Sequence, residues 1–362
     1  MPTPPPLPLV RAVNAAMRWL GRARRAITPP PLTVLEMTSM AYFTSSGVLA
    51  AISLGIPGAL KDGPRSPAQI ASAIGADADA VFRLLRALSS VGLFDESNGC
   101  YSLNRLSMQL LPGTPGSMAP IMRFAAEGWH HRAWGALAEA VRTGKSGSTI
   151  ALGKPLFEYL EDDAEATAIF HEGMSSFSSQ TAEAVVAVYD LSTAVKLVDV
   201  GAGHGQFLAV ALARHPRLRG VAFDRPHAVE GATATFAVAG CADRVEIVSG
   251  SFFDAPLPAG GDIYTLMNIL HDWSDADAER ILRRCREALP PLGKLLIVEM
   301  VLPADNRQNY GSLFDLEMMV LLDGGRERTE ADFRRLCAAA GLRVERVLPT
   351  ASLSCVIEVG RS

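Results

Sequence analysis

The sequence lacks several features that would place it in other classes of protein. Its 362 residues contain no apolar run of about 18 residues, which is the length that a membrane-spanning helix needs. Prolines crowd the first eight residues, where a signal peptide would need its apolar core to begin. The five cysteines are scattered and form no C-x-x-C pair, which argues against both a disulfide framework and a zinc site. These absences predict a cytoplasmic protein that needs no metal.

The sequence also lacks an excess of charge of either sign. Its net charge is −4, so no broad positive field would attract nucleic acid. Hydrophobic residues make up 49% of the chain and charged residues 20%, which is typical of a globular protein. The length is sufficient for two domains.

Residues 1–31 are predicted to form a proline-rich, basic extension, in which no acidic residue occurs before Glu36. Apolar residues recur in it at heptad spacing, at Val10, Val13, Met17, Leu20 and Ile27. Arginines fall away from this seam, so the pattern predicts an amphipathic helix. Three roles stay open: packing on its own domain or on a partner subunit, which we favour, peripheral contact with an anionic membrane, and a transit peptide.

Residues 32–115 are predicted to form a mainly helical winged-helix domain. The expected elements are a helix from Ser66 to Gly75, a second helix capped by Asp77 or Asp79 and stopped by Gly92, and a β-hairpin over 93–103. A winged helix suggests a DNA-binding regulator, but three basic side chains stand against four acidic ones over 66–111. Because DNA binding needs a basic stripe to neutralise phosphates, we interpret the domain as a packing or dimerisation domain.

Residues 116–190 are expected to be a helical linker that contributes to the substrate pocket, and residues 191–362 an α/β domain. The expected strands are 197–200, 221–223, 245–248, 263–267, 295–299, 343–348 and 354–359. The first five alternate with helices, as in a parallel sheet built from βαβ units. The last two have hairpin spacing, so the sheet is expected to end in an antiparallel pair.

A glycine-rich turn directly follows the first strand. Its glycines are Gly201, Gly203 and Gly205. Glycines let the backbone approach a ligand closely, and the helix that follows offers free N–H groups at its start. The dinucleotide pattern G-x-G-x-x-G would need a glycine where this chain has Gln206, and Asp224 ends the next strand, where a carboxylate accepts hydrogen bonds from ribose hydroxyls. These features indicate S-adenosylmethionine (SAM) as the cofactor.

Two further segments are expected at the same edge of the sheet, where open α/β sheets bind ligands. Ser251 and Phe252 follow the third strand; Phe252 is expected to stack on adenine, although one ring of the pair Phe252 and Phe253 is expected to belong to the core. His271 follows the fourth strand, and its near-neutral pKa suits removal of a proton from a hydroxyl group. A lone histidine is more often structural, but Glu299 ends the fifth strand and Glu327 lies further along the chain.

Four segments, 198–205, 223–227, 270–275 and 324–329, stand in the order and spacing of one family. Over residues 33–360 the chain resembles the SAM-dependent O-methyltransferases of the plant caffeate and animal hydroxyindole type, which include bacterial enzymes of antibiotic and pigment pathways. The resemblance implies a Rossmann-like SAM-methyltransferase fold, and a homodimer formed through the winged-helix domain. It also implies methyl transfer to a phenolic or enolic hydroxyl of a small molecule, with S-adenosyl-L-homocysteine as the second product.

The resemblance further implies roles for individual residues. His271 would be the general base, with Glu299 and Glu327 beside it. The residues that would hold or border the SAM are Gly201, Gly203, Gly205, Asp224, Ser251, Phe252 and Met267. Met174 and Met318 match positions that line the methyl-transfer pocket, and the aromatic-rich segments add Trp129, His130 and Phe170 as candidates for the acceptor pocket.

The chain departs from the family pattern at two positions on the cofactor side. Ser251 stands where the family usually has an acidic residue, and Met267 stands where many members have lysine. Both changes affect the expected strength of SAM binding and leave the base untouched. A SAM-dependent decarboxylation or hydroxylation on the same fold is the alternative chemistry, and the complete set of His271, Glu299 and Glu327 argues against it.

Overall fold

The computed structural model describes residues 7–114, 116–305 and 309–362. The prolines predicted to open the extension, Pro2, Pro4, Pro5 and Pro6, lie outside these ranges. The described chain forms two compact units, of which one holds residues 11–131 and 172–176 and the other holds residues 7–10, 132–171 and 177–362. The predicted division at 31, 115 and 190 stays a prediction.

Helix α1 (Leu7–Ile27) confirms the helix expected in the extension. The side chains of Val13, Met17 and Leu20 in its apolar seam are 51%, 63% and 52% exposed. What covers this seam stays a prediction: packing on its own domain or on a partner subunit, peripheral contact with an anionic membrane and a transit peptide all remain open.

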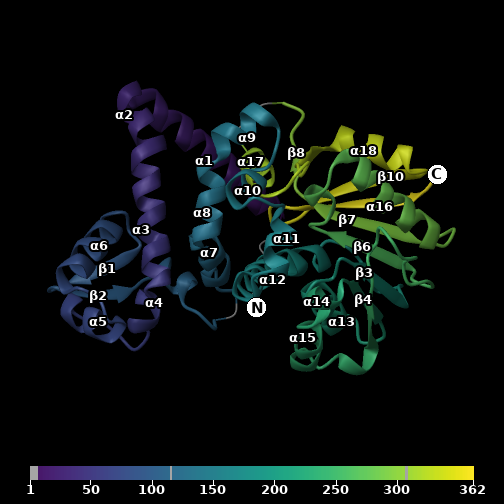
Figure 1. Ribbon diagram of the computed structural model, residues 1–362, viewed down its shortest axis with the longest axis horizontal. Helices are drawn as coiled ribbons and strands as arrows, with labels where there is room; N and C mark the ends of the chain where they lie inside the picture. Colours follow the sequence, from purple (N-terminus) through teal and green to yellow (C-terminus); the bar gives the residue numbers. More distant parts are fainter. Residues whose placement is uncertain (1–6, 115, 306–308) are drawn as a thin grey trace. The chain divides into compact units, whose positions relative to one another are not determined.

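The first unit contains the predicted winged helix (Figure 1). Its elements are α2 (Pro30–Leu35), a π-helical turn (Glu36–Met40), α3 (Ala41–Ser53), α4 (Ile56–Ala59), α5 (Pro67–Ile74), α6 (Ala78–Ser90), β1 (Phe94–Ser97) and β2 (Cys100–Leu103). Ser66 caps α5 in a reciprocal capping box with Gln69, and the carboxylate of Asp77 caps α6. Strands β1 and β2 pair antiparallel, which confirms the hairpin.

The chain from 116 to 190 is helical, as predicted. Its helices are α7 (Ala119–Ala126), α8 (Gly128–Gly135), α9 (Leu137–Thr143), α10 (Gly147–Leu152), α11 (Leu156–Glu161) and α12 (Ala164–Val186). None of the helices in the described part of the chain is long and apolar enough to cross a membrane. All five cysteines are free.

A seven-stranded sheet forms the centre of the second unit (Figure 1). Its strands, in spatial order, are β10 (Leu342–Pro349), β11 (Cys355–Arg361), β7 (Lys294–Glu299), β6 (Ile263–Met267), β3 (Lys196–Val200), β4 (Arg219–Asp224) and β5 (Val245–Ser249). The five strands from β7 to β5 run parallel, and β11 pairs antiparallel with both β7 and β10. The expected strands and the antiparallel final pair are confirmed, and the last strand lies between β7 and β10.

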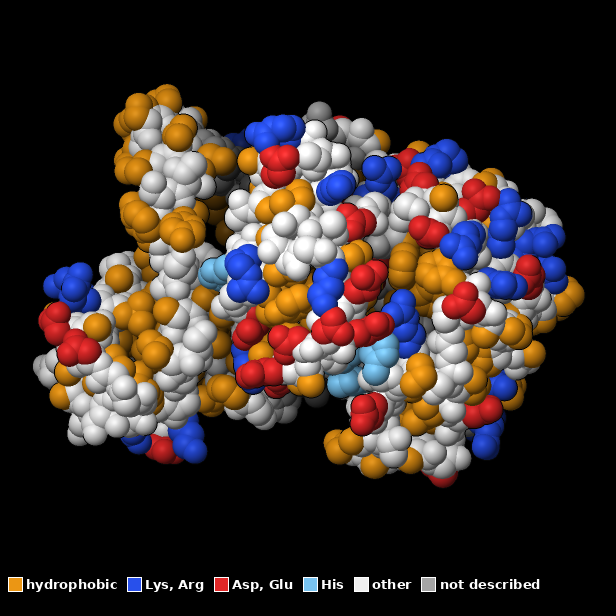
Figure 2. Space-filling view, viewed as in Figure 1, with side chains coloured by type: hydrophobic (Ala, Val, Ile, Leu, Met, Phe, Trp, Pro, Cys, Tyr) orange, Lys and Arg blue, Asp and Glu red, His pale blue; other side chains and the backbone are white. Residues whose placement is uncertain are grey.

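Helices cover both faces of this sheet. Helices α16 (Asp275–Ala288) and α18 (Glu330–Ala339) share one buried cluster with strand residues such as Val198, whereas α13 (Gln206–Arg214) and α15 (Ala232–Val238) share another with neighbours such as Leu197. Successive residues of a strand point to opposite faces, which explains why both faces are apolar. Basic and acidic side chains are interspersed over α16 and α18, as Figure 2 shows, which is typical of solvated helix faces.

Candidate active site

His271 lies on a tight turn that follows β6. The turn begins at Asn268, whose φ of 53° lies in the left-handed region that asparagine tolerates better than most residues. A short 3-10 helix, Leu270–Asp272, then carries His271 at the carboxyl edge of the sheet. His271 therefore lies where it was predicted, and its side chain is 14% exposed.

Glu299, at the end of β7, accepts hydrogen bonds from the backbone of this turn. Its Oε1 atom accepts hydrogen bonds from the backbone nitrogens of Ile269 at 3.0 Å and Leu270 at 2.8 Å. Its Oε2 atom lies 3.6 Å from Nδ1 of His271 and has no hydrogen-bond partner among the described residues. Glu299 therefore anchors the backbone beside the histidine and also adds a negative charge to the buried site.

Glu327 makes the closest contact with the imidazole ring. Its Oε1 atom lies 2.9 Å from Nδ1 of His271, and its side chain is fully buried. The backbone nitrogen of Glu327 donates to Asp315 Oδ1 at 2.8 Å, which fixes the segment that carries it. Because Nδ1 is engaged by Glu327, Nε2 is the nitrogen left to meet a substrate.

Asp272 completes the site and was not predicted. Its Oδ1 atom lies 3.4 Å from Nε2 of His271, the nitrogen that Glu327 leaves free. The only signal in the sequence was its position next to His271, since no spacing argument distinguishes it from a helix-capping residue.

Three carboxylates determine the ionisation of His271. Burial alone lowers the pKa of the imidazole, but the negative charges of Glu299, Asp272 and Glu327 raise it to about 10. Burial in turn raises the pKa of Asp272 to about 6 and that of Glu299 to about 7. The site favours an imidazolium ion and stabilises the charge that appears when the ring takes a proton.

The same three side chains have the spacing of a metal site. Ligand atoms of His271, Glu299 and Glu327 all lie within 4.8 Å of one another, and no other group in the described ranges meets this criterion. One imidazole and two carboxylates are also an acceptable ligand set for zinc. The expectation that the protein needs no metal therefore stays a prediction.

The glycine turn after β3 is shaped by close contacts. Gly201 and Gly205 have φ values of 79° and 74°, and a Cβ atom added to them would lie 2.3 Å from Ile269 and from Phe236, respectively. At Gly203, by contrast, an added Cβ would meet no atom within 4 Å. The turn therefore packs against the protein at both ends and leaves open space at its middle, as a cofactor cradle requires.

Asp224, the last residue of β4, forms a hydrogen bond with this turn. Its Oδ2 atom accepts from the nitrogen of Gly203 at 2.8 Å, and its Oδ1 atom accepts from the nitrogen of Arg225 at 2.7 Å. Burial raises the pKa of this carboxyl group, whereas the two backbone hydrogen bonds oppose the rise. A carboxylate oxygen has more than one lone pair, so both atoms retain capacity for ribose hydroxyls.

An aromatic cluster flanks the predicted adenine position. Phe253 lies between the guanidinium of Arg280, at 4.7 Å, and the ring of Trp273, also at 4.7 Å. Phe252 contacts the rings of Phe253 and Trp273 edge-on. Phe253 is thus the better-fixed ring of the pair, which leaves Phe252 as the candidate for adenine stacking. The hydroxyl of Ser251 accepts from the nitrogen of Phe253.

The predicted pocket residues are distributed over both units. In the second unit, Phe170 contacts Phe157, which stacks on Trp273, and Met318 is buried in α17 (Gly311–Leu321). Met267 is buried in the cluster beneath α13, so its side chain packs in the core. Met174, Trp129 and His130 belong to the first unit, where Trp129 and His130 are buried beside Phe124. Their roles at a substrate stay predictions.

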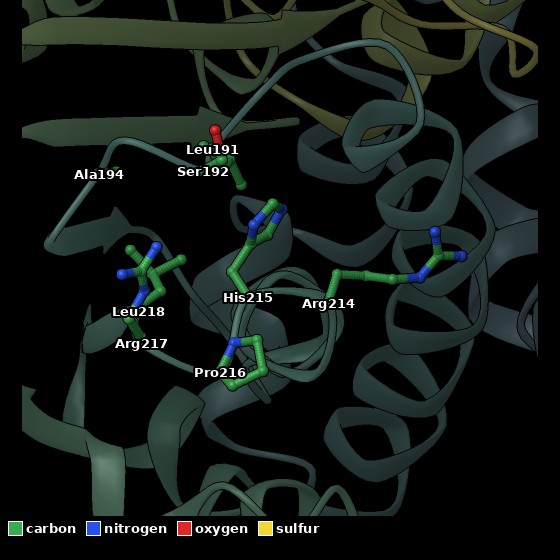
Figure 3. Close-up of a pocket in the computed structure, with 8 residues that line it drawn as sticks. All are labelled: Leu191, Ser192, Ala194, Arg214, His215, Pro216, Arg217 and Leu218. Carbon is green, nitrogen blue, oxygen red and sulfur yellow. The ribbon is translucent and has the colours of Figure 1, made fainter.

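A pocket also exists at the opposite edge of the sheet. Leu191, His215 and Leu218 line it, together with Arg214 (Figure 3). These residues directly precede β3 and β4, so the pocket lies at the amino ends of the strands, away from His271. Arg214 is paired with Glu183 at 2.7 Å. The pocket is therefore not part of the candidate active site.

Two family models match the chain. The model of the O-methyltransferase domain matches residues 134–343, and that of the O-methyltransferase dimerisation domain matches residues 37–113. The chain therefore belongs to the O-methyltransferase family. It is 39% identical to a phenazine O-methyltransferase of Lysobacter antibioticus over 92% of this chain and 97% of that protein. It is 39% identical to a mitomycin biosynthesis 6-O-methyltransferase of Streptomyces lavendulae over 91% and 93%.

Solved structures agree with this assignment. The human N-acetylserotonin methyltransferase in complex with SAM matches with a TM-score of 0.85 and 26% identity, over 93% of this chain and 99% of that one. An O-methyltransferase from neocarzinostatin biosynthesis, bound to SAM and 2-hydroxy-5-methyl naphthoic acid, matches with a TM-score of 0.75 and 34% identity, over 88% and 96%. The predicted α/β methyltransferase fold with an N-terminal helical domain is confirmed.

Proposed function

We propose that this O-methyltransferase transfers a methyl group from SAM to a phenolic or enolic hydroxyl of a small aromatic molecule, with His271 as the general base. The observation that carries the proposal is the contact between Nδ1 of His271 and Glu327, which leaves Nε2, with Asp272 Oδ1 at 3.4 Å, as the ring nitrogen that can take a proton from a substrate. Relatives are named as O-methyltransferases of a phenazine and of 3-amino-4-hydroxybenzoate, and one is named for mitomycin biosynthesis, which supports an aromatic acceptor in antibiotic or pigment biosynthesis.

The residues at the carboxyl ends of β3 and β4 fit SAM. The open space at Gly203 gives room for the cofactor, and the carboxylate of Asp224 would hold its ribose. When bound, SAM supplies an electrophilic methyl group, so the protein contributes alignment and deprotonation. Phe252 would contact the adenine, and Ser251 would accept a hydrogen bond from it.

His271 would remove the proton of the acceptor hydroxyl as its oxygen gains the methyl group. The proton passes to Nε2, and the imidazolium that forms is stabilised by Glu327, Glu299 and Asp272. The raised pKa of about 10 is close to that of a phenol. Because His271 and a phenol then have similar proton affinities, the free-energy change of proton transfer between them is close to zero, which suits a phenolic acceptor.

We further propose that the enzyme is a homodimer that works in the cytoplasm. The dimerisation domain supports the first statement, as do Tyr42 and Phe43 of α3, whose side chains are 69% and 60% exposed in the single chain. The five free cysteines support a reducing compartment. Size-exclusion chromatography with light scattering tests the dimer, and a monomeric mass would contradict it.

Methylation of an amine is the second candidate reaction. One relative, 35% identical over 85% of this chain, is by its name an N,N-dimethyltransferase that acts on an aminoriboflavin. A neutral amine attacks without prior loss of a proton, so N-methylation does not require a base at His271. Loss of activity in a His271→Ala variant therefore favours the hydroxyl acceptor.

The proposal is tested with a panel of acceptors. Purified protein is incubated with SAM and with phenols, hydroxylated phenazines, hydroxynaphthoates and their amino analogues. We expect S-adenosyl-L-homocysteine and a product heavier by one CH₂ group only with hydroxylated compounds, and none with His271→Ala. Decarboxylated or hydroxylated products, or methylation of the amines alone, would contradict it.

A further inference from the structure

A fully buried arginine connects the turn that carries His271 to the segment that carries Glu327. The side chain of Arg328 is 1% exposed. Its Nη1 atom donates to the carbonyl oxygen of Leu270 at 2.6 Å, and its Nη2 atom donates to that of Trp273 at 2.7 Å. Its Nε atom donates to Oδ1 of Asp275 at 3.0 Å. One guanidinium thus holds the residues on both sides of His271.

The backbone on either side of Arg328 reinforces this connection. The nitrogen of Arg326 donates to the carbonyl oxygen of His271 at 2.8 Å, and an added Cβ at Gly325 would lie 3.1 Å from that same oxygen. Arg328 itself belongs to β9 (Arg328–Thr329), which pairs with β8 (Val301–Leu302), two residues beyond Glu299. The three segments that carry His271, Glu299 and Glu327 therefore meet at Arg328.

We propose that Arg328 is a positioning residue for methyl transfer, which sets the distance between the His271 imidazole and the Glu327 carboxylate. This inference rests on the proposed role of His271 as the base. Glu299 fixes the start of the turn through the nitrogens of Ile269 and Leu270. Apart from the contact between His271 and Glu327 itself, the described hydrogen bonds that connect the turn to the Glu327 segment come from Arg328 and from the nitrogen of Arg326.

The geometry requires arginine at this position. Its planar guanidinium presents donors in a fixed fork, whereas lysine presents one compact ammonium group. A lysine could retain the charge beside Asp275 but could not reach both carbonyl oxygens in the same arrangement. The buried carbonyl of Leu270 would then lose its shorter hydrogen bond and keep only the one from the nitrogen of Trp273 at 3.3 Å, and the turn would relax.

Arg335 provides a matched control. Its Nη2 atom bonds to Oδ2 of the same Asp275 at 2.8 Å and to Asp332 at 3.2 Å. The side chain is 57% exposed and makes no hydrogen bond with the turn among the described residues. Loss of Arg335 therefore removes a partner of Asp275 without removing a contact that positions His271.

The experiment compares Arg328→Lys, Arg328→Ala and Arg335→Ala in the full-length protein. The first readout needs no acceptor: the pKa of His271 is measured by NMR of protein with ¹³C-labelled histidine, with the signal assigned by its absence in His271→Ala. We expect the pKa to fall toward its ordinary value in Arg328→Lys, because the carboxylate of Glu327 is no longer held against the ring, and to be unchanged in Arg335→Ala. SAM binding should change by only a few-fold in each variant.

The second readout is turnover with an acceptor found in the panel above. We expect kcat to fall about a hundredfold in Arg328→Lys, as small displacements of a catalytic group cause, with little change in the KM for SAM. Added guanidinium ions should partly restore Arg328→Ala, which a merely lowered stability would not allow. If Arg328→Ala does not fold, Arg328→Lys decides the question alone.

Two results separate the inference from the function on which it rests. A normal His271 pKa shift and normal kcat in Arg328→Lys would overturn the role of Arg328 and leave the proposed base intact. Full turnover by His271→Ala would overturn the base and, with it, the positioning role in catalysis. Equal losses in Arg328→Lys and Arg335→Ala would also overturn the inference, since they would indicate a general effect through Asp275.

Discussion

Nδ1 of His271 lies 2.9 Å from Oε1 of Glu327, although 56 residues separate the two in the chain. This contact determines which imidazole nitrogen faces a substrate, because a ring nitrogen that donates to a carboxylate cannot also accept a proton. It leaves Nε2, the proposed proton acceptor, beside Asp272.

Replacement of His271 by alanine should abolish most turnover. We expect kcat to fall by about 10²–10⁴-fold, since that is the usual contribution of a positioned acid or base. The affinity for SAM, measured by calorimetry, should stay within a few-fold of the wild-type value. His215→Ala, at the opposite edge of the sheet, is the control and should keep full activity (Figure 3). Comparable turnover in both variants would exclude His271 as the base.

The pH dependence of the reaction should shift when Glu327 is replaced by glutamine. A base works in its neutral form, so kcat/KM should rise with pH up to the raised pKa of His271, about 10. Glu327→Gln removes one of the carboxylates that raise this pKa, and the rising limb should move to lower pH by about one unit or more. The maximal rate should fall, because the base becomes weaker.

The control for this shift is Glu330→Gln, which removes an exposed carboxylate paired with Arg334. Its profile should coincide with that of the wild type, as an exposed ion pair has little influence on a buried group. If the rising limb of the kcat/KM profile moves to higher pH in Glu327→Gln, His271 is not the titrating base.

Asp224 should be essential for cofactor affinity. Asp224→Ala removes the acceptor for the nitrogens of Gly203 and Arg225 and the predicted partner of the ribose hydroxyls. The loss of a hydrogen bond to a charged group costs about 2 kcal/mol, so the Kd for SAM should rise about thirtyfold. The exposed Asp254, in the next loop, is the control, and Asp254→Asn should bind SAM normally. An unchanged Kd in Asp224→Ala would place the cofactor elsewhere.

Ser251→Asp should strengthen SAM binding. A carboxylate accepts a stronger hydrogen bond than a hydroxyl does, by about 1 kcal/mol, which corresponds to a Kd lower by about fivefold. The backbone nitrogen of Phe253, which now donates to Ser251, would keep an acceptor. Isothermal titration of both proteins with SAM and S-adenosyl-L-homocysteine measures the change, and weaker binding by the variant would contradict the predicted adenine contact.

Removal of metal should not affect turnover, although His271, Glu299 and Glu327 have the spacing of a ligand set. The proposed reaction needs Nε2 as a free base and the carboxylates as charge partners, so a bound cation would compete with the proton. We expect equal rates before and after dialysis against a chelator. Loss of activity that zinc restores would assign these side chains to a metal instead.

Much of the site could be predicted from the sequence because it follows directly from strand order. Gly201, Asp224 and His271 each stand at the end of a strand, and the parallel ends of such strands meet at one edge. Asp272 was missed, because the sequence around it does not distinguish a site residue from a surface or helix-capping residue. Arg328 was part of a recognised motif, but nothing local shows that its guanidinium reaches back to Leu270 and Trp273.

For the apolar seam of α1, the sequence predicts the local structure but not the tertiary contacts. Its heptad spacing predicts the helix correctly, since periodicity is a local property, but does not show what covers the seam. The side chains of Val13, Met17 and Leu20 are more than half exposed in the single chain, which only the tertiary structure shows.

The sequence by itself therefore determined the class of fold, the glycine turn and the position of His271, because these depend on short-range patterns and on strand order. Tertiary structure decided which imidazole nitrogen is free, that Glu299 holds the backbone of the turn, and that Arg328 joins the segments around His271. Those properties depend on distances between residues far apart in the chain, and burial then multiplies the effect of each charge on its neighbours.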